Sequence, residues 1–263
     1  MEISEFIQML ESIAPSELAL DFDNVGLIIG TTRNIHKVLV ALDCSVAVAR
    51  EAVSIGADLV LTHHPLFFHG IKRILPDDPD TSAAYILIQN GIGLYSSHTN
   101  LDAAPGGVND TLAEILGAQS VLPFTKDGIG RIGLFSPAIS MKELLHRCQN
   151  MLHCKPMYHG NTDTMIHKAW IVSGSGSGSF YNAVDSGCDV FVTGELKHHE
   201  ALSFAEYGIP YIICGHYQSE TIMLKKWISR LQRFESDVQY YLTISEKPLF
   251  SIYEEDIKCP DRN

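Results

Sequence analysis

Several features are missing from this sequence of 263 residues, and each absence narrows the class of protein. No segment reaches the roughly 20 consecutive apolar residues that a membrane-spanning helix needs. None of the six cysteines forms a CxxC pair, and the N-terminal segment carries acidic residues without the basic n-region of a signal peptide. We therefore expect free thiols, a cytoplasmic location and no association with membranes.

Positive charge is also scarce. The chain has 19 Lys and Arg residues against 31 Asp and Glu residues, a formal net charge of −12. Binding along a nucleic-acid backbone needs clustered Lys and Arg side chains, so we do not expect nucleic acid as a partner. An anionic small molecule would need a local source of positive charge, and bound metal ions could supply it.

A weak internal repeat relates two parts of the chain. Residues 35–62 and 166–193 share eight identities without a gap, beginning with Ile-His-Lys in both copies. Each copy has the pattern of a strand, a helix, a Gly-x-Asp turn and a second strand that ends at Thr. A further helix and strand follow in both copies. Apolar, β-branched runs that alternate with helices predict buried parallel strands in an α/β sheet.

We therefore expect an α/β fold of two related three-layer α/β/α halves that arose by internal duplication, with a dinuclear metal site in the cleft between them. The first half is predicted to span residues 1–125 and to be completed by residues 215–263, and the second half to span residues 126–214. A last strand over residues 239–245 is predicted to return to the first half. The charged tail after Glu254 is expected to be loose.

Polar side chains collect after the predicted strands, at the edge where open α/β sheets bind their ligands. Three imidazoles and two carboxylates among them suit Zn, Mn or Fe better than Mg or Ca. Two such ions would activate water for attack on a substrate, as in two-metal hydrolysis. The candidate metal ligands are His63, His64, Asp102, His216 and Glu220, and the candidate catalytic residues are Glu195 and His199.

Each candidate also has a simpler interpretation. His63 and His64 could lie on a solvated loop. Since neighbours in an extended segment point to opposite faces, they serve one site only if the chain turns, or else they bind two metals side by side. His216 and Glu220, four residues apart, could be an ordinary pair on a helix surface. Asp102 could cap the next helix. The metal-site hypothesis rests on their shared position after strands.

The turn Gly174-Ser175-Gly176-Ser177-Gly178 joins a predicted strand to a predicted helix in the second copy. Such a turn can cradle a phosphate with its backbone amides at a helix N-terminus. The segment lacks a lysine, however, and a tight packing turn explains it equally well.

Five motifs occur in a characteristic order over residues 1 to about 250. They are Asp23-Asn24-Val25-Gly26-Leu27, His63-His64-Pro65, His98-Thr99-Asn100-Leu101-Asp102, Thr193-Gly194-Glu195 with His198-His199, and Gly215-His216 with Glu220. This set resembles the NGG-interacting-factor-three-like family, whose bacterial members are often labelled GTP cyclohydrolase 1 type 2 homologs. The chain is similar to the short form, which has no inserted domain.

The resemblance implies a dinuclear metal site and a toroidal homohexamer. By analogy, His64 and Asp102 would bind one ion, His63 and His216 the other, and Glu220 would bridge both. Zinc, manganese and iron all remain candidates for the two ions.

The cyclohydrolase label implies a metal-dependent hydrolase, in which metal-activated water attacks GTP or a related small molecule and Glu195 or His199 carries the proton. Other family members are described as partners of transcriptional regulators. A metal-binding scaffold or regulatory interaction protein without turnover is therefore an alternative, and a metallophosphoesterase is another. Fold and metal site alone do not separate these functions.

Overall fold

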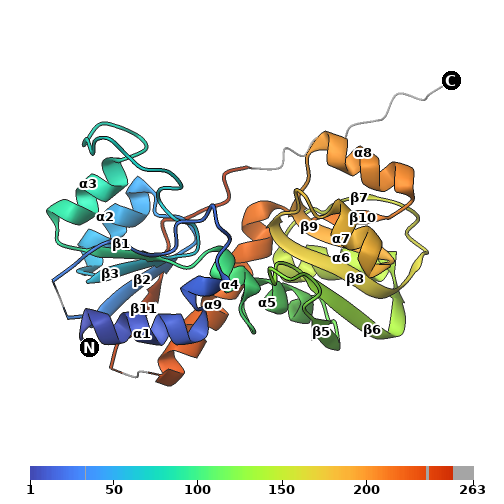
Figure 1. Cartoon of the computed structure of the whole chain (residues 1–263), viewed down its shortest axis with the longest axis horizontal. Coiled ribbons are helices and arrows are strands. Elements are labelled where there is room, and N and C mark those ends of the chain that lie inside the picture. Colours follow the sequence, from blue (N-terminus) through green and yellow to red (C-terminus); the bar gives the residue numbers. More distant parts are fainter. Residues whose placement is uncertain (33, 235–236, 251–263) are drawn as a thin grey trace.

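The computed structural model describes residues 1–32, 34–234 and 237–250 and contains two β-sheets, each flanked by helices (Figure 1). In the first sheet, β2, β3, β4 and β11 run parallel and β1 pairs antiparallel with β4. The parallel pairs are joined by helical crossovers, as such connections require. In spatial order the strands are β1 (Gly26–Ile29), β4 (Gly93–Ser96), β3 (Leu59–Thr62), β2 (Lys37–Ala41) and β11 (Gln239–Leu242).

The second sheet is mixed. Its strands β8, β9 and β10 are parallel, whereas β5, β6 and β7 join antiparallel at its two sides. In spatial order the strands are β5 (Ser120–Leu122), β6 (Arg131–Ser140), β8 (Met165–Ser175), β9 (Val190–Glu195), β10 (Tyr211–Ile213) and β7 (Met157–His159). The two sheets form the left and right lobes of Figure 1.

The longest helix, α9, lies between the two lobes (Figure 1). Trp227 and Leu231 on α9 belong to the core of the first half, whereas Ile222 packs against the core of the second half. The helix therefore joins the halves along their inner faces. The helices are α1 (Ile3–Ile13), the 3₁₀ helix η1 (Ser16–Leu18), α2 (Val46–Ile55), α3 (Ser82–Gln89), α4 (Thr99–Ala103), α5 (Val108–Ile115), α6 (Met141–Leu152), α7 (Phe180–Ser186), α8 (His198–Tyr207) and α9 (His216–Phe234).

The internal repeat is visible in matching contacts. Asp58 Oδ2 accepts the two backbone amides at the start of β2, at 2.9 and 3.0 Å, and Asp189 Oδ2 accepts the corresponding amides of β8, at 2.8 and 2.9 Å. Lys37 Nζ donates to the last turn of α2, and Lys168 Nζ donates to the last turn of α7. These shared contacts and the shared order of strands and helices confirm the predicted α/β fold of two related halves.

The chain returns to the first sheet at its C-terminal end, because β11 pairs in parallel with β2, as predicted. The division at residue 125 stays a prediction, and the predicted loose tail after Glu254 lies outside the described residues. The five cysteines of the described part are free thiols. Within that part of the chain, no helix is both long and apolar enough to cross a bilayer.

Candidate metal centre

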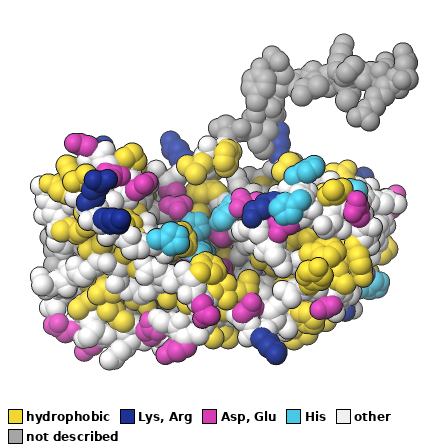
Figure 2. Space-filling model, turned by 45° about the horizontal axis from the view of Figure 1, so that its top comes forward, with side chains coloured by type: hydrophobic (Ala, Val, Ile, Leu, Met, Phe, Trp, Pro, Cys, Tyr) yellow, Lys and Arg dark blue, Asp and Glu magenta, His cyan; other side chains and the backbone are white. Residues whose placement is uncertain are grey.

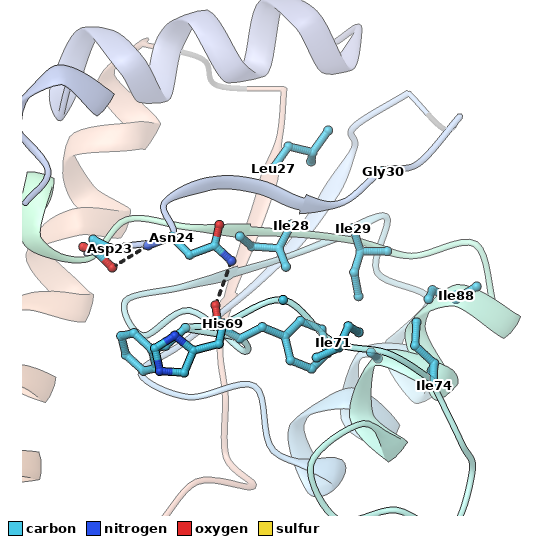
Figure 3. A pocket seen from close by; sticks show the side chains of 14 residues that line it. Asp23, Asn24, Leu27, Ile28, Ile29, Gly30, His69, Ile71, Ile74 and Ile88 are labelled. Carbon is cyan, nitrogen blue, oxygen red and sulfur yellow. Dashed lines mark hydrogen bonds between the residues drawn. The ribbon is translucent and has the colours of Figure 1, made fainter. Parts of the chain in front are cut away.

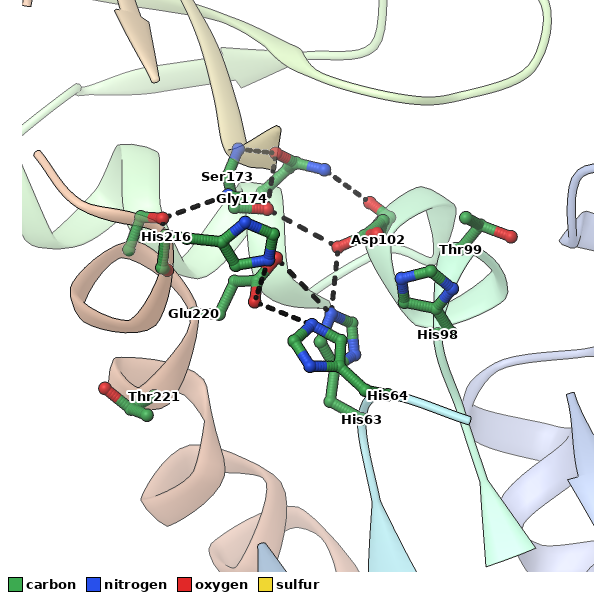
Figure 4. A network of polar contacts seen from close by, with 12 residues as sticks. His63, His64, His98, Thr99, Asp102, Ser173, Gly174, His216, Glu220 and Thr221 are labelled. Carbon is green, nitrogen blue, oxygen red and sulfur yellow. Dashed lines mark hydrogen bonds and ion pairs between the residues drawn. The ribbon is translucent and has the colours of Figure 1, made fainter. Parts of the chain in front are cut away.

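Four histidines and two carboxylates converge between the halves. Figure 4 shows them pointing toward one another, and Figure 2 shows histidine side chains in the hollow between the two lobes. The first sheet contributes the residues after β3 and β4, α4 contributes one carboxylate, and the N-terminal turns of α9 contribute the rest. We call this set the central cluster: His63, His64, His98, Asp102, His216 and Glu220.

Glu220 lies at the middle of the central cluster, and its side chain is only 4% exposed. Its Oε2 atom lies 3.0 Å from His64 Nε2 and 3.1 Å from His216 Nε2. His63 Nε2 lies 3.8 Å from Glu220 Oε1 and 3.7 Å from Asp102 Oδ1. The adjacent histidines His63 and His64 thus reach different oxygens of one carboxylate, because the chain turns after β3.

The other ring nitrogen of each imidazole has an acceptor outside the cluster. Carbonyl and carboxylate oxygens cannot donate, so the hydrogen bonds of His63, His64 and His98 place the hydrogen on Nδ1, and a neutral ring then presents a lone pair at Nε2. Outer partners of this kind commonly orient histidines that bind metals. The Nδ1 pairs are His63 with Ser97 O (2.8 Å), His64 with Asp43 Oδ1 (2.8 Å), His98 with Asp23 Oδ1 (2.9 Å) and His216 with Glu195 Oε1 (3.3 Å).

These donors fit a divalent metal ion. Nε2 lone pairs face carboxylate oxygens in a buried space, an arrangement that costs free energy unless positive charge is present. Among the described residues, His63 Nε2 and Glu220 Oε2 have no hydrogen-bond partner. Two groups have ligand atoms within 4.8 Å of one another: His63, His64 and His98, and His64, His216 and Glu220. Imidazole and carboxylate donors suit Zn, Mn or Fe.

The pKa values of residues in the central cluster also show that positive charge is favoured there. Burial opposes protonation of His64, but the Asp43 and Glu220 carboxylates raise its pKa to about 10. The neighbouring Glu220 carboxylate raises the pKa of His216 to about 9. Although burial favours the neutral acid, the imidazoles hold the pKa of Glu220 well below its usual value. For Asp102, burial raises the pKa.

Glycines let the second half approach the cluster closely. Gly174, at the end of β8, has φ +57°, and a Cβ atom there would overlap Glu220 Oε1. A Cβ atom at Gly194 would overlap the Gly174 carbonyl oxygen. Gly174 N also donates to Ser219 Oγ, at 2.9 Å, on α9. Of the two interpretations of the glycine-rich turn, close packing accounts for Gly174.

Asp102 lies within α4 and does not cap the next helix, because α5 begins after Gly107 without a side-chain cap. Ser173 Oγ donates to Asp102 Oδ1 at 3.4 Å, and Asn109 Nδ2 donates to the Asp102 carbonyl oxygen at 3.1 Å. Asn109 therefore holds the Asp102 backbone, and Ser173 of the second half contacts its carboxylate.

The two candidate catalytic residues differ in position. Glu195 is 57% exposed in its side chain and contacts His216 Nδ1, so the structure brings it to the edge of the cluster. His199 is exposed in the first turn of α8, next to Glu200 in the chain, and within the described part of the chain it has no hydrogen bond or ion pair with the cluster. His98 is the member that the sequence analysis did not select. Its place directly after a predicted strand is the same signal that identified His63 and His64.

A cavity of about 720 Å³ lies beside the cluster, between β1 and the loop that precedes α3. Figure 3 shows Ile28 and Ile29 on one side and Ile71 and Ile74 on the other. Asn24 Nδ2 ties the loop to the first strand through the Phe67 carbonyl oxygen, at 2.7 Å. The cavity adjoins the cluster because Asp23, which lines it, holds His98 and the neighbouring Phe68 ring packs edge-on against His98 at 5.6 Å.

Comparisons with known proteins find relatives that match nearly the whole chain. A Clostridium perfringens protein named "GTP cyclohydrolase 1 type 2 homolog" is 37% identical over 259 residues, which cover 95% of this chain and 99% of the relative. The "Protein NIF3 homolog" of Schizosaccharomyces pombe is 33% identical and is covered over 86% of its length, against 84% of this chain.

Solved structures share the fold over nearly the whole chain. The crystal structure of a Staphylococcus aureus hypothetical protein superposes with a TM-score of 0.88 at 27% identity, covering 96% of this chain and 99% of that one. Reduced HcgD from Methanocaldococcus jannaschii superposes with a TM-score of 0.81 at 32% identity, covering 92% and 97%. The model of the Duf34/NIF3 (NGG1p interacting factor 3) family matches residues 1–248, and the chain belongs to this family.

Proposed function

We propose that this protein is a dinuclear-metal-dependent hydrolase of the GTP cyclohydrolase 1 type 2-like kind, acting on a nucleotide or a related small molecule. The observation that carries the proposal is the convergence of Nε2 atoms on the buried Glu220 and the partly buried Asp102, with every Nδ1 engaged outside the cluster. Two Zn, Mn or Fe ions there would lower the pKa of water and polarise a substrate oxygen. The name "GTP cyclohydrolase 1 type 2 homolog", which several relatives carry, supports this class of reaction.

The contacts also favour a particular distribution of the ligands. His64 and His216 share Glu220 Oε2, which supports one ion at these three residues. His63 lies between Asp102 and Glu220 Oε1, which supports the other. The family resemblance implies instead that His64 pairs with Asp102 and His63 with His216. In both distributions Glu220 would bridge the two ions. Variants that each remove one ligand distinguish the distributions, because each variant should weaken the binding of the ion that the removed residue holds.

Glu195 is proposed as a proton carrier at the edge of the site. Its carboxylate contacts His216 on one side and is exposed to solvent on the other, so it can orient the imidazole and exchange a proton with bulk water. His199 is proposed as a second proton carrier, supported by its position in the duplicated motif after β9 and by its exposure on α8.

We propose that the apolar cavity beside His98 receives the part of the substrate that does not react. Its volume falls within the range typical of small-molecule sites, and most of its lining residues have aliphatic or aromatic side chains. Lys72 and Arg73 lie on the same loop, between the lining residues Ile71 and Ile74, and are exposed. They offer positive charge to an anionic group in an otherwise acidic chain.

The test is a mass-spectrometric screen of purified, metal-reconstituted protein against nucleotides. Formate release from GTP supports a cyclohydrolase-type reaction. Phosphate release instead identifies a metallophosphoesterase, and two bound ions without consumption of any substrate favour a metal-binding scaffold or regulatory partner. Ile71→Asp, which places a charge in the cavity wall, should raise KM for an active nucleotide more than it lowers kcat.

We also infer that copies of the chain assemble into the toroidal hexamer that the family resemblance implies. Light scattering coupled to gel filtration tests this, since a hexamer has six times the 29.1 kDa mass of one chain. A monomeric mass contradicts the assembly but leaves the metal centre unaffected, because every residue of the central cluster comes from one chain.

A further inference from the structure

The segment that follows β11 is held along the edge of the first sheet where the strands β2 and β3 end. Thr243 N donates to Val40 O at 2.9 Å, which continues the pairing of β11 with β2. Glu51 on α2 then accepts the backbone amides of Ile244 and Ser245, each at 3.1 Å. Figure 1 shows the chain continuing from β11 toward the space between the lobes. These contacts bring Glu246 to the end of β2.

Glu246 binds two consecutive backbone amides with its two carboxylate oxygens. Its Oε2 atom accepts from Leu42 N at 3.0 Å, and its Oε1 atom accepts from Asp43 N at 2.7 Å. Both amides lie just beyond the last residue of β2, Ala41. Backbone donors near the protein interior need partners, and a charged acceptor makes shorter and stronger hydrogen bonds than a neutral one. The carboxylate therefore fixes the backbone of this turn.

The same turn orients His64 of the central cluster. Leu42 O accepts the backbone amide of His64 at 2.9 Å, and Asp43 Oδ1 accepts His64 Nδ1–H at 2.8 Å. The opposite ring atom, His64 Nε2, faces Glu220 Oε2 at 3.0 Å. A continuous series of hydrogen bonds thus connects Glu246 to the metal-facing nitrogen of a residue about 180 positions earlier in the chain.

We propose that Glu246 is a positioning residue of the metal centre, which holds Asp43 and through it sets the orientation of the His64 imidazole. The inference rests on the proposed binding of metal ions by the central cluster. Glu246 lies in the segment after β11, whereas all the proposed metal ligands lie in other segments. The segment after β11 thus also helps to form the site. Outer partners of metal-binding histidines typically change metal affinity by about 10- to 100-fold when removed.

The first test compares metal binding by the full-length protein and Glu246→Ala, with Zn²⁺ titrated against a competing chelator. The ion that His64 binds should lose about 10- to 100-fold in affinity, while the other ion keeps its affinity. Glu246→Gln retains an acceptor oxygen and should fall between the two. Glu11→Ala is the matched control, because Glu11 also accepts a backbone amide, that of Ser16 at 2.7 Å, without any contact to His64 in the described part of the chain.

A double-variant cycle separates positioning from a general loss of structure. If Glu246 acts through Asp43, then Asp43→Ala with Glu246→Ala should bind Zn²⁺ no more weakly than Asp43→Ala alone. Full additivity of the two losses, or equal affinity of both ions in Glu246→Ala and the native protein, overturns the proposal.

A measurement on metal-free protein tests the positioning role of Glu246 separately from the proposed binding of metal ions. The ¹⁵N resonance of His64 Nδ1 should shift in Glu246→Ala and not in Glu11→Ala. That result supports the positioning role even if the native protein binds fewer than two ions. An unchanged His64 resonance contradicts the role even if both ions bind.

Discussion

Asp58 in the first half and Asp189 in the second make the same contacts, yet the residues that end the strands beside them differ. Where the first copy has His63 and His64 after its second strand, the second copy has Gly194 and Glu195. Where the first copy has Asp43, which orients His64, the second has Gly174, which gives room to Glu220. The Gly-x-Asp turns and their contacts are the same in both halves. The strand ends differ, because those of the first half carry candidate ligands and those of the second half include glycines that leave space for Glu220.

The difference explains why α9 completes the site. The second half contributes little from its own strand ends, and its glycines let the N-terminal turns of α9 enter the centre. His216 and Glu220 then take the positions opposite His63 and His64. The two halves are related by duplication, but the site between them is asymmetric. Imidazoles of the first half face side chains of α9, a helix that packs against both halves.

The largest expected loss of metal binding comes from replacing Glu220, which both proposed ions share. Glu220→Gln keeps the size of the side chain but removes the charge that faces three imidazoles, so both ions should be lost. Elemental analysis after metal reconstitution should find only traces, whereas the exposed control Glu143→Gln should bind as the native protein does. Retention of two ions in Glu220→Gln contradicts the bridging role.

The next effect tests the space that the second half provides. Gly174→Ala places a methyl group onto Glu220 and should greatly reduce metal content. Gly178→Ala is the control, because Gly178 also has a positive φ, +82°, but faces open space. Both variants should lose about 1–2 kcal/mol of unfolding free energy from backbone strain. Equal metal content in the two variants would show that close approach at Gly174 is unimportant.

A smaller effect tests the shared framework. Asp58→Ala and Asp189→Ala each remove one carboxylate that accepts two backbone amides. Each should destabilise the protein by about 1–2 kcal/mol, since hydrogen bonds to charged groups are strong but these are partly screened by solvent. Urea unfolding checks the values. A large loss in one variant and none in the other would break the equivalence of the halves.

The smallest effect concerns a contact that only the first half has. Glu51 ties the segment after β11 to α2, whereas the second copy has Asn182 at the matching position. Burial alone would raise the pKa of Glu51, but hydrogen bonds from Thr243 and the following amides lower it. Its contribution to stability is therefore present above its unfolded-state pKa of about 4.3 and is lost as pH falls through the lower folded-state pKa.

Glu51→Gln should accordingly be less stable than the native protein at pH 6, and the difference should shrink below pH 4. Thermal unfolding at the two pH values measures it. Because the carboxylate is partly exposed, the change in midpoint should be a few degrees at most. A difference that grows on acidification would assign the effect to another group.

Much of the fold was predictable because the repeat is local. The Gly-x-Asp turns and the alternation of apolar strands with helices act within short stretches, and a comparison of residues 35–62 with 166–193 reveals them. The grouping of the five candidate ligands was predictable because each of their motifs follows a strand, although His216 and Glu220 follow a strand of the second sheet and lie on α9. His98 follows the same rule, since it comes just after β4, in the same motif as Asp102.

The outer partners were not predictable, because they depend on contacts between distant segments. Asp23 reaches His98 across 75 residues, and Glu246 reaches the Asp43 amide across 203 residues. No periodicity or spacing relates such pairs in the sequence. The sequence also does not show which ring nitrogen of each histidine faces the centre of the cluster. This depends on the acceptor that the folded chain places beside Nδ1.

The proposed metal centre requires two ions, one on either side of Glu220. Anomalous diffraction from crystals of the metal-reconstituted protein, recorded at the absorption edge of the added metal, tests this. We expect two anomalous peaks about 3.5–4 Å apart, one near His64 and one near His63, with Glu220 between them. A single peak, or peaks away from Glu220, would contradict the proposed centre.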